Sequence, residues 1–327
     1  MQTKWIIAIF IVIIFSAIGF AQKQSPCVLA GHPATSGQGE SWRYMGKTPP
    51  GKAAELFAPE IIKHLAHSSP TFTPDGKEIY WSTTSGENET RKIYYTKYEN
   101  NKWSPSIVAP FSGNYHDDHP FISYDGKNLF FASKRPKEPS GSQENDIWIA
   151  DKIEQGWSEP KPINNFIGLW TPTVTRTRQG ILTGQGTLYF LDIADGFKRN
   201  CGIFRSEFIN GAYSTPELLP EQINQKESLD WCPFIAADES YLIFSSDREG
   251  GYGSGDLYIS FKEKNGNWRK AINMGAAINT DKQERFPGVS PDGKYLFFTR
   301  WHSEPNFHDL YWLDAGIIND LRNSEQK

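Results

Sequence analysis

The run His116-Asp117-Asp118-His119 concentrates more chemically versatile side chains than any other short stretch of this sequence. Two imidazoles with adjacent carboxylates suit several divalent ions. A solvated turn is the other interpretation, and no third ligand can be identified from spacing. The sequence therefore predicts no bound metal and no cofactor.

Other polar and aromatic residues raise the possibility of carbohydrate chemistry. Asp118, Asp230 and Glu284 offer carboxylates for a glycosidase pair, but a sequence does not give the separation between them. Trp170 and Trp231 could stack on a sugar or pack between repeats. Nucleophile-elbow, phosphate-loop, dinucleotide-loop and His-Glu-x-x-His motifs do not occur, so those enzyme classes are excluded and no catalytic residue can be assigned.

The composition is that of a turn-rich β protein. Among 327 residues, 14% are aromatic, and 28 Gly and 21 Pro supply turns. The formal net charge is only -4 and no basic stripe is present, so we expect no nucleic-acid partner.

Five segments repeat one pattern, in which a proline is followed by small and branched or aromatic residues in alternation. The prolines are 50, 52, 61 and 54 residues apart, at Pro70, Pro120, Pro172, Pro233 and Pro287. A period of this length in an aromatic-rich β sequence predicts a propeller with one blade per repeat.

Each repeat resolves into four short strands. The first follows the proline, and in three repeats an Asp-Gly turn leads to an aromatic second strand. The third repeat lacks Asp-Gly, and the fourth has Glu239 where the others have Gly. A third strand follows a variable loop, and the fourth is expected to open on an aromatic residue, namely Trp103, Trp157, Tyr213 or Trp268.

The fifth repeat lacks its fourth strand, and residues 317–321 resemble a short helical tail. The missing strand is found near the other end of the chain, where residues 54–59 resemble the fourth-strand segment 215–220. We therefore predict an all-β fold, a five-bladed β-propeller of four-stranded antiparallel blades with the ring closed by an N-terminal strand. An open arc, or a sixth blade in the N-terminal leader, is the alternative.

The repeat Pro-x-Phe-Ser/Thr-x-Asp-Gly-Lys, followed by aromatic strand residues, resembles the TolB-type, WD-like propeller repeat. Residues 244–260 are similar to the copies in exported bacterial proteins, and the resemblance covers about residues 52–314. It implies the propeller fold. It leaves function open, because the family includes binding, scaffolding and enzymatic members.

Propeller topology predicts which loops share a face. We use "near face" for the side from which each first strand starts, and "far face" for the side of the Asp-Gly turns. The candidate ligand-binding residues of the near face are His67, His116, Asp118, His119, Trp170, Asp230, Trp231, Glu284, Arg285, Arg248, Arg300 and His302. Such a mixture suits a polar ligand that needs both stacking and hydrogen bonds.

The N-terminus predicts export. Lys4 precedes a short apolar run, and Gly19 and Ala21 suit a cleavage site, so residues 1–21 are interpreted as a signal peptide. An uncleaved anchor is the alternative. Residues 22–51 are expected to be a flexible leader and 52–327 the propeller with its tail. Export would permit a disulfide between Cys201 and Cys232, although their expected positions in adjacent blades argue against it.

From these features we expect a periplasmic or secreted, monomeric binding or scaffolding module without a membrane span in its mature form. Its partner would be a protein or a glycan bound at the near face. The alternative is a carbohydrate-active enzyme, a lyase or hydrolase using histidine and acidic residues of the same face.

Overall fold

A computed structural model describes residues 43–62, 66–85, 90–137, 141, 145–163, 180–182, 186–209, 212–303 and 307–325. The chain divides into two units, residues 1–40 and 41–327. All the described residues belong to the second unit, which is nearly all β. Among them no helix is long and apolar enough to cross a membrane.

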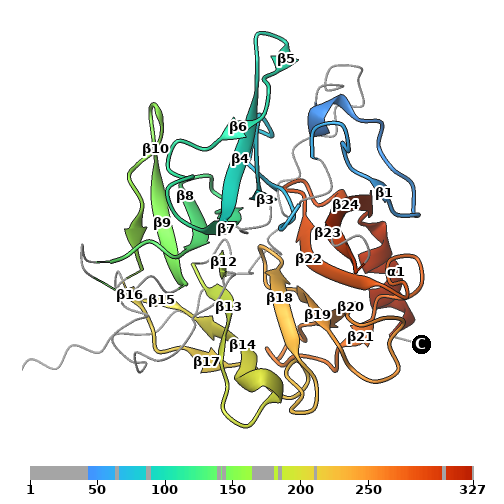
Figure 1. The fold of residues 1–327 in the computed structure, drawn as a ribbon. Helices are drawn as coiled ribbons and strands as arrows, with labels where there is room; N and C mark the ends of the chain where they lie inside the picture. Colours follow the sequence, from blue (N-terminus) through green and yellow to red (C-terminus); the bar gives the residue numbers. More distant parts are fainter. Residues whose placement is uncertain are drawn as a thin grey trace, which may run out of the picture. The chain divides into compact units, whose positions relative to one another are not determined.

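The second unit is a five-bladed β-propeller, as predicted from the repeats (Figure 1). Its blades are antiparallel sheets in which consecutive strands pair side by side. Blades 1 and 2 comprise β2 (Thr71–Phe72), β3 (Glu78–Ser85), β4 (Thr90–Glu99), β5 (Lys102–Trp103) and β6 (Ile107–Val108), then β7 (Asp117–Ile122), β8 (Asn128–Ser133), β9 (Asp146–Ile153), β10 (Gly156–Trp157) and β11 (Lys161–Pro162).

Blades 3 to 5 follow the same plan. They comprise β12 (Gly180–Leu182), β13 (Leu188–Ile193), β14 (Cys201–Ser206) and β17 (Glu217–Leu218), then β18 (Asp230–Ile235), β19 (Tyr241–Ser246), β20 (Asp256–Phe261) and β21 (Ile272–Asn273), and finally β22 (Gln283–Val289), β23 (Tyr295–His302) and β24 (Phe307–Asp314) with β1 (Glu55–Leu56). A separate ribbon, β15 (Phe208–Ile209) with β16 (Ala212–Tyr213), extends blade 3.

An N-terminal strand closes the ring, as predicted. Glu55 pairs with Trp312 and Leu56 with Tyr311, so β1 is the outermost strand of blade 5. The pair Glu55-Leu56 corresponds to Glu217-Leu218 of β17, which holds the same position in blade 3. Closure covers a sheet edge that would otherwise remain exposed.

Aromatic side chains of the second strands pack between the blades. The largest fully buried side chains include Tyr80, Phe130, Phe131, Tyr189, Phe190, Phe244, Phe297 and Phe298. A polar contact joins blade 2 to blade 1, since Trp157 Nε1 donates to the Tyr80 hydroxyl at 2.9 Å. Trp157 was expected to open the fourth strand of blade 2. It lies in β10, which forms a hairpin with the end of β9, and the outer strand β11 follows it.

Three Asp-Gly turns share one hydrogen-bond pattern. In blade 2, Ser123 Oγ donates to Asp125 at 2.7 Å, and the Lys127 N–H donates to the same carboxylate at 3.1 Å. The backbone φ angles of Gly76, Gly126 and Gly293 are 71°, 72° and 71°, values that residues with a side chain rarely adopt. Glu239 takes that position in blade 4 with φ 57°, and its carboxylate pairs with Lys262 at 2.6 Å.

Several details differ from the sequence prediction or extend it. The described inner strand of blade 3 is β12 at Gly180–Leu182, whereas the predicted segment from Thr171 lies outside the described residues. Residues from Arg43 onward already pack on blade 5, where the 3-10 helix η1 (Tyr44–Gly46) places Tyr44 against Tyr295. The helical tail is α1 (Gly316–Ser324). Cys201 and Cys232, the pair considered from the sequence, are not bonded to each other.

Candidate functional site

The inner strands of three blades contain the same β-bulge at their near-face ends. The pairing register shifts between Asp118 and Phe121 in β7, and at the equivalent points of β18 and β22. The residue before the proline has positive φ in each case: 52° at His119, 56° at Cys232 and 52° at Phe286. A bulge bends the strand and redirects side chains that would otherwise alternate between its faces.

Three residues before each of these prolines stands a buried carboxylate, which an arginine of the same blade neutralises. The N–O distances are 2.9 Å for Arg135–Asp117, 3.0 Å for Arg248–Asp230 and 2.7 Å for Arg300–Glu284. Burial raises the pKa of Asp117 and of Glu284, and the arginines oppose that rise.

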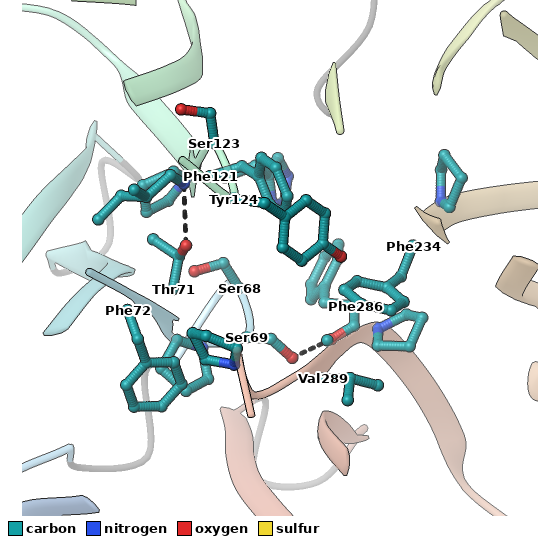
Figure 2. Close-up of a pocket in the computed structure, with 18 of the residues that line it drawn as sticks. Ser68, Ser69, Thr71, Phe72, Phe121, Ser123, Tyr124, Phe234, Phe286 and Val289 are labelled. Atoms are coloured by element: carbon teal, nitrogen blue, oxygen red, sulfur yellow. Dashed lines mark hydrogen bonds between the residues drawn. The ribbon is translucent and has the colours of Figure 1, made fainter. Parts of the chain in front are cut away.

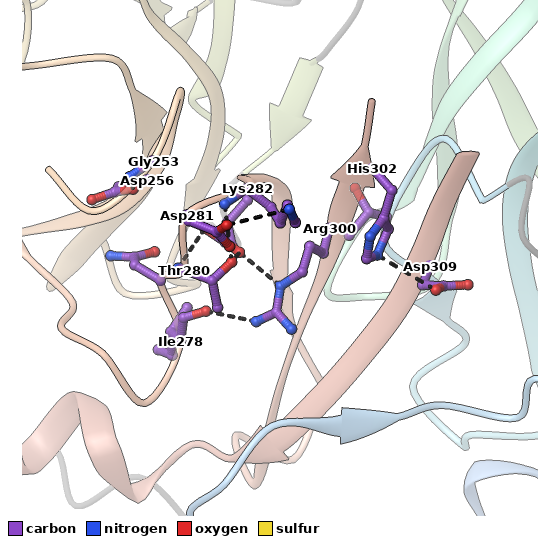
Figure 3. Close-up of polar contacts among 12 residues, drawn as sticks. Gly253, Asp256, Ile278, Thr280, Asp281, Lys282, Arg300, His302 and Asp309 are labelled. Atoms are coloured by element: carbon purple, nitrogen blue, oxygen red, sulfur yellow. Dashed lines mark hydrogen bonds and ion pairs between the residues drawn. The ribbon is translucent and has the colours of Figure 1, made fainter. Parts of the chain in front are cut away.

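These arginines also hold the loop that enters each blade. Arg300 donates to the Ile278 carbonyl at 3.0 Å, and Glu284 accepts a hydrogen bond from the Thr280 hydroxyl at 2.7 Å (Figure 3). Arg135 and Arg248 make the corresponding bonds to the Phe111 and Ile223 carbonyls. The recurrence in three blades indicates a structural role for four predicted site residues, Asp230, Arg248, Glu284 and Arg300.

Asp118 is the centre of a different, unrepeated cluster. Its carboxylate is 1% exposed and lies 3.1 Å from His67 Nδ1, 3.1 Å from His119 Nε2 and 2.7 Å from Arg91 Nη1. The Ser82 hydroxyl donates to its other oxygen at 2.7 Å. His67, Arg91 and Ser82 come from blade 1, so the cluster joins two neighbouring blades.

Burial and charge determine the protonation of this cluster. Burial would raise the pKa of Asp118, but the neighbouring His119, His67 and Arg91 hold it well below its usual range. Burial lowers the pKa of His67, and Asp118 opposes the shift only in part. Burial, with help from His67 and the arginines, lowers the pKa of His308 to about 2. At neutral pH the site therefore contains an ionised carboxylate beside the neutral imidazoles of His67 and His308.

Aromatic rings and a second arginine surround the cluster. The rings of His67 and Phe286 have centroids 4.8 Å apart, and those of His67 and His308 5.3 Å apart. The Arg285 guanidinium lies 5.5 Å from the Trp301 ring and 6.0 Å from the Trp231 ring. Arg285 thus connects the buried cluster with the aromatic side chains of the near face.

A cavity of about 70 Å³ lies on the axis beyond the bulges (Figure 2). Its wall extends from His119 and Phe286 to Pro74, Tyr124 and Pro291, which precede or adjoin the Asp-Gly turns. The wall is largely apolar apart from a few hydroxyl groups, including those of Ser69 and Thr71. This cavity therefore belongs to the far-face side of the axis, whereas the charged cluster lies at the near-face side.

The structure brings some of the predicted site residues together and separates others. His67, Asp118 and His119 meet, with Arg285 beside them. His302 instead faces Asp309 on the hairpin of blade 5, at 3.6 Å (Figure 3). His116 is half-buried just before β7 and is not part of the three-residue cluster, and Trp170 lies outside the described residues. Trp231 is buried rather than exposed.

Sequence reasoning missed Arg91 and Ser82. Arg91 is the second residue of β4, the third strand of blade 1, and Ser82 lies within β3, its second strand. Neither position carries a recognisable motif, because their contact with Asp118 crosses from one blade to the next. Only the near-face topology could have indicated that these two positions share a surface with β7.

No family model and no curated protein matches this chain significantly. Solved structures with a similar fold include TolB from Acinetobacter baumannii, with 18% identity and a TM-score of 0.44 over 76% of this chain and 56% of TolB. This chain therefore spans little more than half of TolB. An alpha-L-arabinofuranosidase from Lactobacillus brevis has 14% identity and a TM-score of 0.49 over 77% of this chain and 91% of that one.

An alpha-L-arabinofuranosidase from Podospora anserina, solved in complex with cellotriose, has 10% identity and a TM-score of 0.46 over 81% of this chain and 94% of that one. Similarity at this level carries no functional argument. The five-bladed fold rests on the strand pairing described above, and any function has to be argued from the site.

Proposed function

We propose that this chain is an exported β-propeller that acts as a binding or scaffolding module, in the periplasm or outside the cell, for a protein or glycan partner. The observation that supports this most directly is the position of Arg285 between Trp231 and Trp301 at the near face, next to the Asp118 cluster. The likeness of its repeats to the TolB type is consistent with such a role.

The chemistry of Arg285 suits a ligand with carboxylate or hydroxyl groups. A guanidinium offers several donors in a fixed plane and matches a carboxylate with two parallel hydrogen bonds. Its aromatic neighbours restrict its rotamers, which reduces the entropy lost on binding. An acidic sugar or a peptide carboxylate is therefore the ligand chemistry that we expect at this face.

A second candidate function is a carbohydrate-active enzyme, and the contact between Asp118 and His67 favours it. If Asp118 accepts the Nδ1 proton of His67, the Nε2 atom of that ring carries the lone pair of a general base. Asp230 and Glu284 are each paired with an arginine, so a two-carboxylate hydrolase has less support than a lyase with a histidine base.

A binding screen on the full chain tests the leading proposal. Arrays of neutral and acidic glycans and of peptides would be probed with the wild-type protein and with Arg285→Ala. Arg269→Ala is the matched control, because Arg269 pairs with Glu263 on the outer part of blade 4. We expect Arg285→Ala to weaken binding at least tenfold at an unchanged melting temperature, and Arg269→Ala to bind like the wild type.

Three results would contradict the proposal or redirect it. Equal loss of binding in both variants would refute the near-face location. Binding to no glycan or peptide on the arrays would argue against a recognition module of this chemistry. Turnover of a bound glycan, abolished in His67→Gln, would identify the chain as an enzyme instead.

A further inference from the structure

Among the described residues, the cluster at Asp118 is the one group of three side chains placed closely enough to hold a metal ion. His67 precedes β2 in blade 1, and Asp118 and His119 belong to β7 in blade 2. All three are buried, and one ligand atom from each lies within 4.8 Å of the others. We propose that His67, Asp118 and His119 bind a divalent transition-metal ion, independently of the ligand proposed for the near face.

The hydrogen bonds around Asp118 support this inference. A carboxylate has about four lone-pair sites. Five nitrogen or oxygen atoms lie within bonding distance of its two oxygens, contributed by the Ser82 hydroxyl, the His119 backbone N–H, Arg91, and the rings of His67 and His119. His119 Nε2 approaches the oxygen that Arg91 already occupies, and His67 Nδ1 lies between the two oxygens, 3.1 Å from one and 3.2 Å from the other. A cation among the three groups would let each imidazole contribute a lone pair instead of competing for one.

The spacing of the ligand atoms fits a small ion. Asp118 Oδ2 lies 3.1 Å from His67 Nδ1 and 3.1 Å from His119 Nε2. Ligands at about 2.0–2.1 Å from a tetrahedral ion are separated by about 3.3 Å. The two carboxylate–imidazole distances are therefore close to those around a tetrahedral ion, and the two imidazole nitrogens lie within 4.8 Å of each other.

The bulge in β7 makes this geometry possible. Adjacent residues of a regular strand point to opposite faces of the sheet. Because the register shifts after Asp118 and His119 has φ 52°, both side chains reach His67. The bulges of β18 and β22 have the same backbone but carry Trp231-Cys232 and Arg285-Phe286. The propeller therefore does not require a ligand pair at this position.

The donor types select the class of ion. Two imidazoles and one carboxylate suit Zn²⁺, Ni²⁺, Co²⁺ or Fe²⁺, whereas Ca²⁺ and Mg²⁺ prefer sites made of oxygen atoms. Hydrogen bonds from Ser82 and from the His119 backbone fix the carboxylate, as outer partners do in known metal sites. His308 packs beside His67, and its buried Nδ1 has no hydrogen-bond partner in the described part of the chain, so it is a candidate fourth ligand.

Arg91 gives the proposal a distinctive test. Its guanidinium, 2.7 Å from Asp118 Oδ2, opposes the charge of an ion and competes for the same oxygen. Removing it in Arg91→Met should therefore tighten metal binding. If the cluster were only a structural ion pair, the chain would bind no ion there with or without Arg91, and the substitution would alter stability alone.

The experiment is calorimetric titration of the chelator-treated full chain with ZnCl₂, NiCl₂ and CaCl₂, together with the absorption spectrum of the Co²⁺-loaded protein. We expect one equivalent of Zn²⁺ or Ni²⁺ to bind, no comparable binding of Ca²⁺, and a d–d spectrum with nitrogen ligands. His67→Gln and His119→Gln should weaken Zn²⁺ binding at least tenfold. His116→Gln is the matched control, because it removes an imidazole just outside the cluster.

The wild-type titration keeps the proposal falsifiable even if a ligand variant fails to fold. Failure of the folded wild-type chain to bind Zn²⁺, Ni²⁺ or Co²⁺ would overturn it. Equal weakening by His116→Gln and His119→Gln would overturn it too, since the ion would then be bound elsewhere. Neither result depends on whether the near face binds a glycan or a peptide.

Discussion

The substitution Phe57→Ala tests how strongly ring closure stabilises the propeller. Phe57 follows the two residues of β1 and is 1% exposed, whereas Leu56 beside it is 44% exposed. The Phe57 ring makes edge contacts with Phe297 and Trp312 of blade 5, at centroid distances of 5.1 Å and 5.0 Å. Truncating a fully buried phenylalanine costs about 3–5 kcal/mol in free energy of unfolding. Truncating an exposed leucine usually changes it by no more than about 0.5 kcal/mol.

The assay is urea and thermal unfolding of the two variants, Phe57→Ala and Leu56→Ala, followed by circular dichroism. For a domain of this size, about 2–4 °C is lost per kcal/mol, so Phe57→Ala should melt on the order of 10 °C below the wild type. Leu56→Ala should melt within about 2 °C of it. If the two variants melt together, β1 contributes little and the closure argument fails.

Three further predictions concern other parts of the chain. Asp230→Ala should cost about 3–5 kcal/mol, because it leaves Arg248 buried without its carboxylate, and the double variant Asp230→Leu/Arg248→Met should recover part of the loss in urea unfolding. Asp125→Ala should cost about 1 kcal/mol at pH 7 by removing two turn hydrogen bonds. Partial burial would raise the pKa of Asp125, but the bonds from Ser123 and Lys127 lower it overall, so its stabilisation exists above the unfolded pKa of about 3.9 and is lost as pH falls through the folded value. Unfolding curves of the two proteins should therefore converge in acid. The intact mass of the exported protein should match a chain that begins at Gln22. A mass that matches a chain beginning at Met1 would refute the signal-peptide interpretation.

Much of the fold was predictable because it is local and repeated. A proline, an Asp-Gly turn and an aromatic strand recur in sequence, and each acts within a single blade. Even the long-range closing pair was recognisable, since Glu55-Leu56 resembles Glu217-Leu218. The third repeat was harder to align, because it lacks the Asp-Gly turn that sets the register of the others.

The candidate site was only partly predictable, for a physical reason. Sequence topology placed His67, Asp118 and His119 on one face, but it gave no contacts among them and no role to Asp117, the neighbour of Asp118 in the strand. The bulge gives the two carboxylates different partners. Asp117 pairs with Arg135 inside its own blade, and Asp118 contacts His67 and Arg91 of blade 1. Contacts that cross between blades leave no periodic signal in the sequence.

Blade 1 departs from blades 2, 4 and 5 at the position that matters most for the site. Three residues before the proline, blades 2, 4 and 5 have a carboxylate held by an arginine, and blade 1 has His67. In that blade the pairing with β3 is interrupted between the Ala66–Thr83 bridge and the Thr71–Tyr80 pair, and the His67 N–H donates to the Ser82 carbonyl at 2.9 Å. His67 is thus not used in the repeated structural ion pair and can turn toward Asp118 of the next blade. Blade 1 replaces the ion pair of blades 2, 4 and 5 with a buried cluster of ionisable side chains. At such a position, selection for function is a better explanation than selection for folding.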